Sequence, residues 1–216
     1  MGSNRKIILL GAGGHCLSII DTLLSSYQFE KIGIVDKDNY KNGMDQIMGV
    51  PVLGGDEILS SLFQDGYTDA FIAVGSVGDY DIRKRLYQQI KEIGYHIPNI
   101  IDKTSTVSKF AILGEGIYIG KNAVVNAYAN IQNMVILNTS CTIEHGCRIE
   151  PYAHVAPGSV ICGNVQIGYG THIGAGSVIK QGLQIGADTM VGVGSIVLAD
   201  IGSQLVAYGN PCQVRK

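Results

Sequence analysis

Aliphatic residues recur at every sixth position through the second half of the chain. Seventeen of them stand in register between positions 101 and 197, without a slip. A helix places apolar residues about every 3.6 positions and a half-buried strand about every 2, so neither explains this period. A fixed six-residue period is typical of a β-solenoid built from hexapeptide repeats. The series is Ile101, Val107, Leu113, Ile119, Val125, Ile131, Leu137, Ile143, Ile149, Val155, Ile161, Ile167, Ile173, Ile179, Ile185, Val191 and Val197.

The residues between these aliphatics indicate a narrow, three-sided coil. Two positions before each aliphatic the side chain is usually small, as at Ala123 and Ser177, which fits one large and one small inward side chain per face. Glycine often follows the aliphatic directly, as at Gly168, and we interpret these glycines as corner residues with positive φ. Three hexapeptides make a triangular coil, so residues 101–197 predict about five stacked coils with one continuous core.

The first hundred residues follow a different pattern, in which short aliphatic strands alternate with amphipathic helices. This alternation favours a small α/β (Rossmann-like) domain with a parallel sheet over residues 1–100, followed by the solenoid domain over residues 101–216. Asp56 and Asp79 are the expected N-caps of the second and third helices. The expected strands are 6–10, 31–35, 51–53 and 69–74, and the expected helices are 17–24, 56–64 and 79–93.

A glycine-rich turn follows the first expected strand. It reads Gly11-Ala12-Gly13-Gly14-His15, and Asp36 follows the second strand about twenty residues later. Such glycines let backbone N–H groups and a helix N-terminus approach phosphates, and the acidic residue commonly holds a ribose hydroxyl. Ligands of parallel sheets lie at the carboxyl ends of the strands. We therefore expect a crevice lined by Gly13, Gly14, His15, Asp36, Lys37, Gly75 and Ser76.

One departure from the dinucleotide-binding fingerprint restricts which ligands fit this crevice. The dinucleotide fingerprint has a third glycine where this chain has Cys16, which disfavours a tightly bound dinucleotide. A nucleotide monophosphate or a nucleotide diphosphate sugar fits better. The alternative, a turn that only joins strand to helix, stays open.

Composition and charge restrict the partners and the location. The net charge is close to zero, with 16 Lys and Arg residues against 18 Asp and Glu, and there is no basic run. This charge distribution favours neither a nucleic-acid nor a membrane partner. The longest early apolar run, Ile7–Leu10, is too short for a signal peptide or a membrane span. Among the five cysteines there is no C-x-x-C spacing, and Cys141 and Cys147 fall in the small-residue position of the repeat. We interpret both as packing residues of a protein in the reducing cytoplasm.

Three histidines lie in the repeat, and their spacing is informative in a rigid coil. His154 and His172 are eighteen residues apart, so we expect them to stack on one face of successive coils. His145 and His154 are nine apart, which is half a turn of the coil. These two therefore meet only across an interface, which predicts an active site between subunits.

The repeat and the ending Tyr208-Gly209-Asn210-Pro211-Cys212 resemble the left-handed parallel β-helix of hexapeptide-repeat acyltransferases. With the α/β domain in front, the whole chain is similar to the sugar O- and N-acetyltransferases of the NeuD/PglD type. The resemblance implies acetyl transfer from acetyl-CoA, without a metal, to the amino group of a nucleotide-linked amino sugar held in the first domain. A sialic-acid-type hydroxyl is the alternative acceptor. The family forms homotrimers, which agrees with an active site between subunits.

The segment from Asn138 to Cys147 looks like the catalytic segment of this family, which implies that His145 is the general base. The family often places a carboxylate directly after this histidine, where this chain has Gly146. Glu144 precedes the histidine, and it reaches the ring only if a corner lies between them, because neighbouring strand residues point to opposite sides. The resemblance also implies donor contacts at His154 and a pantetheine arm along Gly163, Gly174, Ala175, Gly192 and Val193.

Three functions of other kinds stay open. Solenoids of this type also form carbonic anhydrases, which hold zinc with three histidines, but the spacings of 9 and 18 differ from theirs. A dehydrogenase would bind NAD in the first domain. Cys16, which replaces the third glycine of the dinucleotide fingerprint, argues against this function. A binding module without catalysis is the third.

Overall fold

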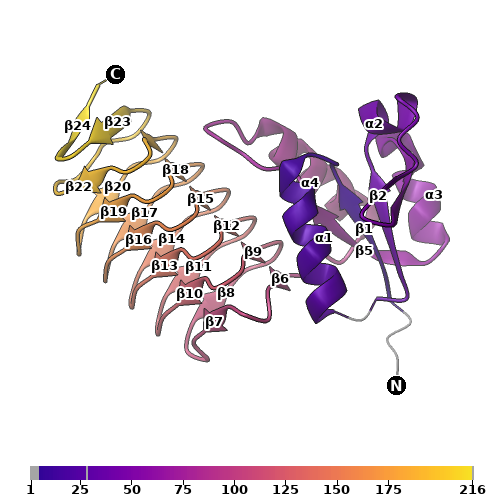
Figure 1. Cartoon of the computed structure of the whole chain (residues 1–216), viewed down its shortest axis with the longest axis horizontal. Coiled ribbons are helices and arrows are strands. Elements are labelled where there is room, and N and C mark those ends of the chain that lie inside the picture. Colours follow the sequence, from indigo (N-terminus) through magenta and orange to yellow (C-terminus); the bar gives the residue numbers. More distant parts are fainter. Residues whose placement is uncertain (1–4, 28, 216) are drawn as a thin grey trace. The chain divides into compact units, whose positions relative to one another are not determined.

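The computed structural model describes residues 5–27 and 29–215, and the chain divides into two compact units. Unit 1 holds the chain up to Gly75 together with Asp81–Pro98, and unit 2 holds Ser76–Tyr80 and the chain from Asn99 onward. Unit 1 is a small α/β domain and unit 2 is a parallel β-helix, which confirms the expected fold class (Figure 1). Within the described residues, no helix is long and apolar enough to cross a membrane.

Unit 1 is built on a five-stranded sheet with the order β3-β4-β2-β1-β5. The strands are parallel except β3, which pairs antiparallel with β4. Because β5 lies on the opposite side of β1 from β2 and β4, the carboxyl ends of β1 and β5 form a topological switch point, where ligands of such sheets bind. The elements are β1 (Lys6–Leu10), α1 (Gly14–Ser26), β2 (Lys31–Val35), α2 (Lys37–Lys41), β3 (Gln46–Ile47), β4 (Val50–Gly54), η1 (Asp56–Ile58), α3 (Leu59–Gln64), β5 (Tyr67–Ile72) and α4 (Asp81–Ile93).

Several boundaries in unit 1 differ from those expected. Asp56 is not an N-cap but the first residue of the 3-10 turn η1, where a carboxylate is favoured by the partial positive charge of the turn. The helix α4 begins at Asp81, two residues after the expected cap Asp79. The strand expected at 69–74 begins and ends two residues earlier, as β5. The short helix α2 was not expected; the Asp36 carboxylate caps it by accepting from the Asn39 N–H.

Unit 2 is a stack of triangular coils whose sides are two-residue strands. They are β6 (Ile100–Ile101), β7 (Thr106–Val107), β8 (Ile112–Leu113), β9 (Tyr118–Ile119), β10 (Val124–Val125), β11 (Asn130–Ile131), β12 (Ile136–Leu137), β13 (Thr142–Ile143), β14 (Arg148–Ile149), β15 (His154–Val155), β16 (Val160–Ile161), β17 (Gln166–Ile167), β18 (His172–Ile173), β19 (Val178–Ile179), β20 (Gln184–Ile185), β21 (Met190–Val191) and β22 (Ile196–Val197). A hairpin of β23 (Val206–Gly209) and β24 (Cys212–Val214) ends the stack.

The three sides of the stack are three parallel sheets. Side 1 consists of β7, β10, β13, β16, β19 and β22; side 2 consists of β8, β11, β14, β17 and β20; side 3 consists of β6, β9, β12, β15, β18 and β21, with β23 and β24 added at its end. Each strand pairs with the strand one coil later, as Ile143 pairs with Ile161. This pairing confirms a coil of eighteen residues.

The core of unit 2 follows the predicted pattern. The second residue of each strand points inward, and Ile143, Ile161 and Ile179 are fully buried. The small residues two positions earlier are buried beside them, and the Ser177 hydroxyl donates to the Gly192 carbonyl oxygen at 3.0 Å. Cysteines fill the same position: burial raises the pKa of Cys141 to about 12 and that of Cys147 to about 11. These thiols therefore stay protonated and act as packing groups, as predicted.

The glycines that directly follow the aliphatics are not the positive-φ residues of the corners, so that interpretation is wrong. From Leu113 to Val191, positive φ occurs at the third residue after each aliphatic, as at Asn122, Gly146 and Asn164. The reason for glycine at the first position is the stacking of the coils. A Cβ on Gly168 would lie 2.5 Å from the backbone nitrogen of Ala187 in the next coil.

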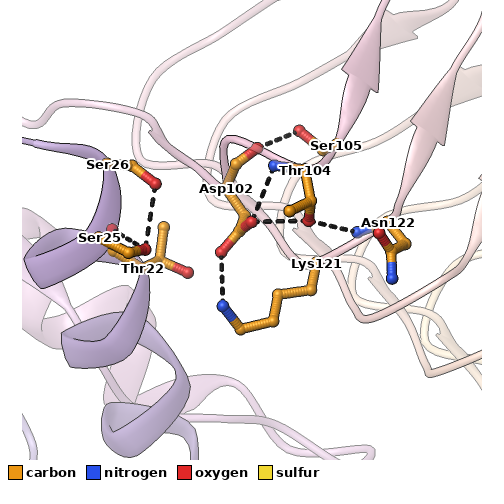
Figure 2. A network of polar contacts seen from close by, with 8 residues as sticks. All are labelled: Thr22, Ser25, Ser26, Asp102, Thr104, Ser105, Lys121 and Asn122. Atoms are coloured by element: carbon orange, nitrogen blue, oxygen red, sulfur yellow. Dashed lines mark hydrogen bonds and ion pairs between the residues drawn. The ribbon is translucent and has the colours of Figure 1, made fainter.

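A buried carboxylate closes the first coil (Figure 2). Asp102, which is 1% exposed, accepts from the backbone N–H and the hydroxyl of Thr104 at 3.0 and 2.8 Å and from Lys121 Nζ at 3.1 Å. The Thr104 hydroxyl accepts in turn from the Asn122 N–H at 3.0 Å. A terminal coil lacks a neighbour on one side, and these side-chain bonds cap it.

Candidate active site

Unit 1 contains a cavity of about 510 Å³ at the carboxyl ends of its strands. Two of the predicted residues, Asp36 and Lys37, line it. Sequence reasoning missed most of the others, although the first turns of α2 and α4 follow parallel strands and so belong at this edge. The remaining lining residues are Gly11, Val35, Asp38, Asp56, Glu57, Val74, Ile82, Arg85 and Leu86.

The Asp36 carboxylate is occupied by protein groups. Its Oδ2 atom accepts from the Ala12 N–H at 2.9 Å, and its Oδ1 atom accepts from the backbone and side-chain nitrogens of Asn39 at 2.9 and 3.0 Å. Asp36 therefore ties the glycine-rich turn to the start of α2. A carboxylate has about four acceptor positions, so a ribose hydroxyl can still share one of its oxygens.

Of the other predicted residues, Gly13, Gly14 and His15 lie at the start of α1 and Gly75 follows β5, all outside the lining of this cavity. Ser76 was also expected here, but it belongs to unit 2, because its carbonyl oxygen is bound by His154. Gly13 is the N-cap without a side-chain cap, and a Cβ on Gly13 or Gly14 would meet nothing within 4 Å, so this turn is open. Gly75 packs against His15, since a Cβ on Gly75 would lie 3.4 Å from the His15 Cβ. Cys16 is fully buried, and burial raises its pKa to about 12; it packs where the fingerprint has glycine.

The cavity of unit 1 carries charges of both signs. Lys37 and Arg85 supply two cations, and Arg85 forms an ion pair with Asp56 at 3.5 Å. Cations of this kind hold phosphate groups, and carboxylates accept from the hydroxyl and N–H groups of a sugar or a base. The cavity is thus chemically suited to a ligand with both kinds of group.

In unit 2, His145 lies at the corner after β13 and borders a cavity of about 350 Å³. Its imidazole lies over Gly163 of the next coil, where a Cβ would stand 2.6 Å from Nε2. The other lining residues are Asn164, Gln181 and Gly182. The ring is exposed, and within the described part of the chain no hydrogen bond reaches either of its nitrogens. An accessible imidazole beside a cavity can take a proton from a bound group.

Glu144 makes its hydrogen bond to the backbone. Its Oε2 atom accepts from the N–H of His145 at 3.2 Å. This bond stabilises the corner that carries His145. It does not orient the imidazole.

His154 and His172 stack on side 3, as the spacing of eighteen predicted. Their ring centroids are 4.8 Å apart in an edge-to-face arrangement, and the two residues are only 9% and 8% exposed. His154 Nδ1 donates to the Ser76 carbonyl oxygen at 2.7 Å, and Nε2 lies 3.3 Å from Asn138 Nδ2. A carbonyl only accepts, so Nδ1 carries the proton and Nε2 accepts from the amide. Burial lowers the pKa of His172, which keeps that ring neutral.

The segment Ser76–Tyr80, here called the strap, covers this histidine column within unit 2. Tyr80 donates to Asp188 Oδ1 at 2.7 Å. Its ring also stacks on Tyr152 and meets Tyr169 edge-on, with centroids 5.5 and 5.3 Å apart. The strap leaves His154 little open surface in the single chain.

The residues predicted to bind the donor separate into two groups. Gly163 lies at the corner between sides 1 and 2, beside His145. Gly174, Ala175, Gly192 and Val193 lie at the corner between sides 3 and 1. Both corners border side 1. Its outward residues are the exposed Thr106 and the half-buried Val124, Thr142, Val160, Val178 and Ile196.

No metal-binding group of three or more His, Cys, Asp or Glu side chains occurs among the described residues.

Known protein families match parts of both units. The family described as PglD N-terminal domain matches residues 6–90, and the family described as bacterial transferase hexapeptide (six repeats) matches residues 146–181.

Several solved structures are similar over nearly the whole chain. PerB from Caulobacter crescentus, in complex with CoA and GDP-perosamine, is 30% identical, with 99% of each chain covered and a TM-score of 0.90. The acetyltransferase domain of PglB from Neisseria gonorrhoeae FA1090, in complex with acetyl coenzyme A, is 29% identical, with 99% of this chain and 100% of that chain covered and a TM-score of 0.90. A perosamine N-acetyltransferase variant from Caulobacter crescentus, with one histidine replaced by asparagine, is 28% identical, with 99% and 98% covered and a TM-score of 0.89.

These matches agree with the two-unit fold and with the hexapeptide-repeat acyltransferase expected from the sequence. The chain belongs to the NeuD/PglD-type sugar acetyltransferases of the left-handed β-helix acyltransferase superfamily, and it is an acyltransferase.

Proposed function

We propose that the protein transfers the acetyl group of acetyl-CoA to the amino group of a nucleotide-linked amino sugar. The observation that carries this proposal is the exposed His145 imidazole beside a cavity lined by glycines and amide side chains. The related structures with CoA and GDP-perosamine, or with acetyl coenzyme A, support the same pair of substrates. In this proposal residues 1–100 bind the nucleotide sugar, and residues 101–216 bind acetyl-CoA and carry out catalysis.

The reaction is a direct attack with His145 as the general base. The neutral sugar amine attacks the thioester carbonyl carbon, and the imidazole takes a proton from the amine. The tetrahedral oxyanion collapses, the carbon–sulfur bond breaks, and the imidazolium returns the proton to the CoA thiolate. The products are the amide and free CoA. Backbone N–H groups stabilise the oxyanion. A general base positioned like His145 typically raises the rate about 10²–10⁴-fold. Glu144 contributes by holding the backbone of His145.

The donor site requires two subunits. His145 and Gly163 stand at one corner of side 1, and Gly174, Ala175, Gly192 and Val193 stand at the other, so two copies packed on this side bring the two groups together. The outward residues of side 1 are mostly β-branched and apolar, as an interface requires. We infer a homotrimer with the pantetheine arm between subunits.

His154 contributes to the donor site by shape. The one N–H of its neutral ring is used by the Ser76 carbonyl, so its contact with the acetyl-CoA thioester region involves the ring edge and not an N–H donor.

The acceptor site is the cavity of unit 1. Lys37 and Arg85 would hold the diphosphate together with the open turn at Gly13 and Gly14, while Asp36 would accept from a ribose hydroxyl. His15 and Gly75 form the neighbouring wall. A cytoplasmic location belongs to this proposal, because nucleotide sugars and acetyl-CoA are cytoplasmic metabolites and the five cysteines are free thiols.

A coupled assay tests the proposal. Protein and acetyl-CoA are incubated with GDP- and UDP-linked amino sugars, with the matching hydroxy sugars and with a sialic acid, and free CoA is measured. We expect release only with an amino sugar, and a loss of about 10²-fold or more in His145→Asn. Release with sialic acid alone would replace N-acetylation by O-acetylation. No release with any acceptor would refute the function.

A further inference from the structure

The side chains of His145 and Asn164 extend past each other between two neighbouring coils. The imidazole of His145 reaches the position of Gly163 in the next coil, 2.6 Å from where its Cβ would be. The amide of Asn164 extends in the opposite direction, and its Oδ1 atom contacts the place where a Cβ of Gly146 would be. Because 145 and 146 are consecutive, as are 163 and 164, the two side chains lie side by side. Both line the cavity of about 350 Å³.

The backbone fixes Asn164 in this place. Its N–H donates to the carbonyl oxygen of His145 at 2.9 Å. Its φ of 59° lies in the left-handed region, which asparagine tolerates better than most residues. Gly146, with φ of 67°, has no side chain that would exclude the amide. Gly146 and Asn164 therefore form a matched pair across two coils.

The sequence does not show which residue orients the His145 imidazole. The position after His145 carries no carboxylate, and the Glu144 carboxylate is engaged with the backbone. We propose that Asn164 is the positioning residue for His145, with its side-chain oxygen accepting the ring N–H that faces away from the substrate. This inference rests on the proposed function for the role of His145.

The chemistry follows from the amide being neutral. An acceptor on one ring nitrogen selects one tautomer and leaves the other nitrogen free as the base. Hydrogen bonds of catalytic groups are often long without substrate and shorten in the complex, so the absence of a direct bond within the described residues is compatible with this role. A neutral acceptor favours the imidazolium less than a carboxylate does, so the enzyme stays active to lower pH than with a carboxylate at this place.

Two variants separate orientation from folding. Asn164→Gly removes the acceptor and keeps the left-handed backbone, and we expect kcat to fall about 10- to 100-fold while both KM values change less than about threefold. Asn164→Asp keeps the shape, and we expect kcat to be largely retained while the acid limb of the kcat–pH profile moves up by about one unit. Asn122→Gly is the matched control, because Asn122 has φ of 55° at the same position of another hexapeptide and does not line the cavity beside His145.

Two further measurements make the test decisive. In the His145→Ala background, Asn164→Gly should cause no further loss, because Asn164 acts through His145. Imidazole ¹⁵N shifts should show one dominant His145 tautomer in the parent and a mixture in Asn164→Gly, whatever the substrate is. Equal tautomer ratios or an unchanged kcat in Asn164→Gly, or an unmoved acid limb in Asn164→Asp, would overturn the inference. Full turnover in His145→Ala would instead overturn the proposed base.

Discussion

His154 donates from Nδ1 to the backbone carbonyl of Ser76 at 2.7 Å, although the two residues are 78 positions apart. This bond joins the strap to the histidine column of side 3. It also decides the protonation of His154, because the second nitrogen then accepts from Asn138. A residue that the family resemblance assigns to the donor thus has a structural partner on its proton-bearing nitrogen.

We predict that His154→Ala lowers the free energy of unfolding by about 1–3 kcal/mol, because it removes the buried hydrogen bond from Nδ1 to the Ser76 carbonyl. Urea denaturation measures this change. Gln166→Ala is the matched control, since Gln166 holds the same outward position on side 2 and is exposed; we expect a change below about 0.5 kcal/mol. Equal stability of the two variants would show that the strap does not depend on this bond.

Gly163→Ala should damage catalysis more than stability. Its Cβ would stand 2.6 Å from two ring atoms of His145, so the imidazole must turn away. A displacement of about 1 Å at a catalytic group can cost about 10²-fold, and we expect a loss of that order in kcat. Gly202→Ala, where a Cβ would meet only Leu205 at 3.4 Å, should keep full activity. The reverse order of activities would contradict the placement of His145.

Side 1 is the predicted interface between subunits. Val160→Asp places a charge among its apolar outward residues, and we expect a monomer in sedimentation experiments together with a loss of acetyl transfer of about 10²-fold or more. Circular dichroism checks that the monomer stays folded. The control is Gln166→Asp on side 2, which should leave both association and turnover unchanged. A folded Val160→Asp monomer with full turnover would contradict the two-subunit site.

The lowered pKa of Asp69 in unit 1 predicts that the stability of the protein depends on pH. Burial raises the pKa of its carboxyl, but hydrogen bonds from Arg5 and from His96, at 2.6 Å from Nδ1, outweigh burial and lower the pKa overall. With a native pKa below the unfolded value of about 3.9, the stabilisation is complete above that value and is lost as the pH falls through the native pKa.

Urea denaturation at a series of pH values measures this contribution. Asp69→Asn should be less stable than the parent at pH 7 and should lose less stability on acidification below about pH 4. Parallel curves for the two proteins would show that Asp69 does not contribute.

The sequence by itself determined the architecture of unit 2. The inward aliphatic and the small residue beside it are local features repeated at a fixed period, so coil length and core residues such as Ile143 and Ser177 could be predicted before any contact was known. The stacking of His154 on His172 followed from the same period. In unit 1 the alternation of strands and helices predicted the sheet, because hydrophobic periodicity is also local.

Only the tertiary structure decided the contacts that depend on how coils and loops meet. It showed that Gly168 is required by the backbone of the next coil, that Asp36 braces the turn at Ala12, and that Ser76 binds His154. The crossing of His145 and Asn164 likewise depends on the exact height of one coil above another. Such contacts join residues 19 to 78 positions apart, and no local pattern of residue types encodes them.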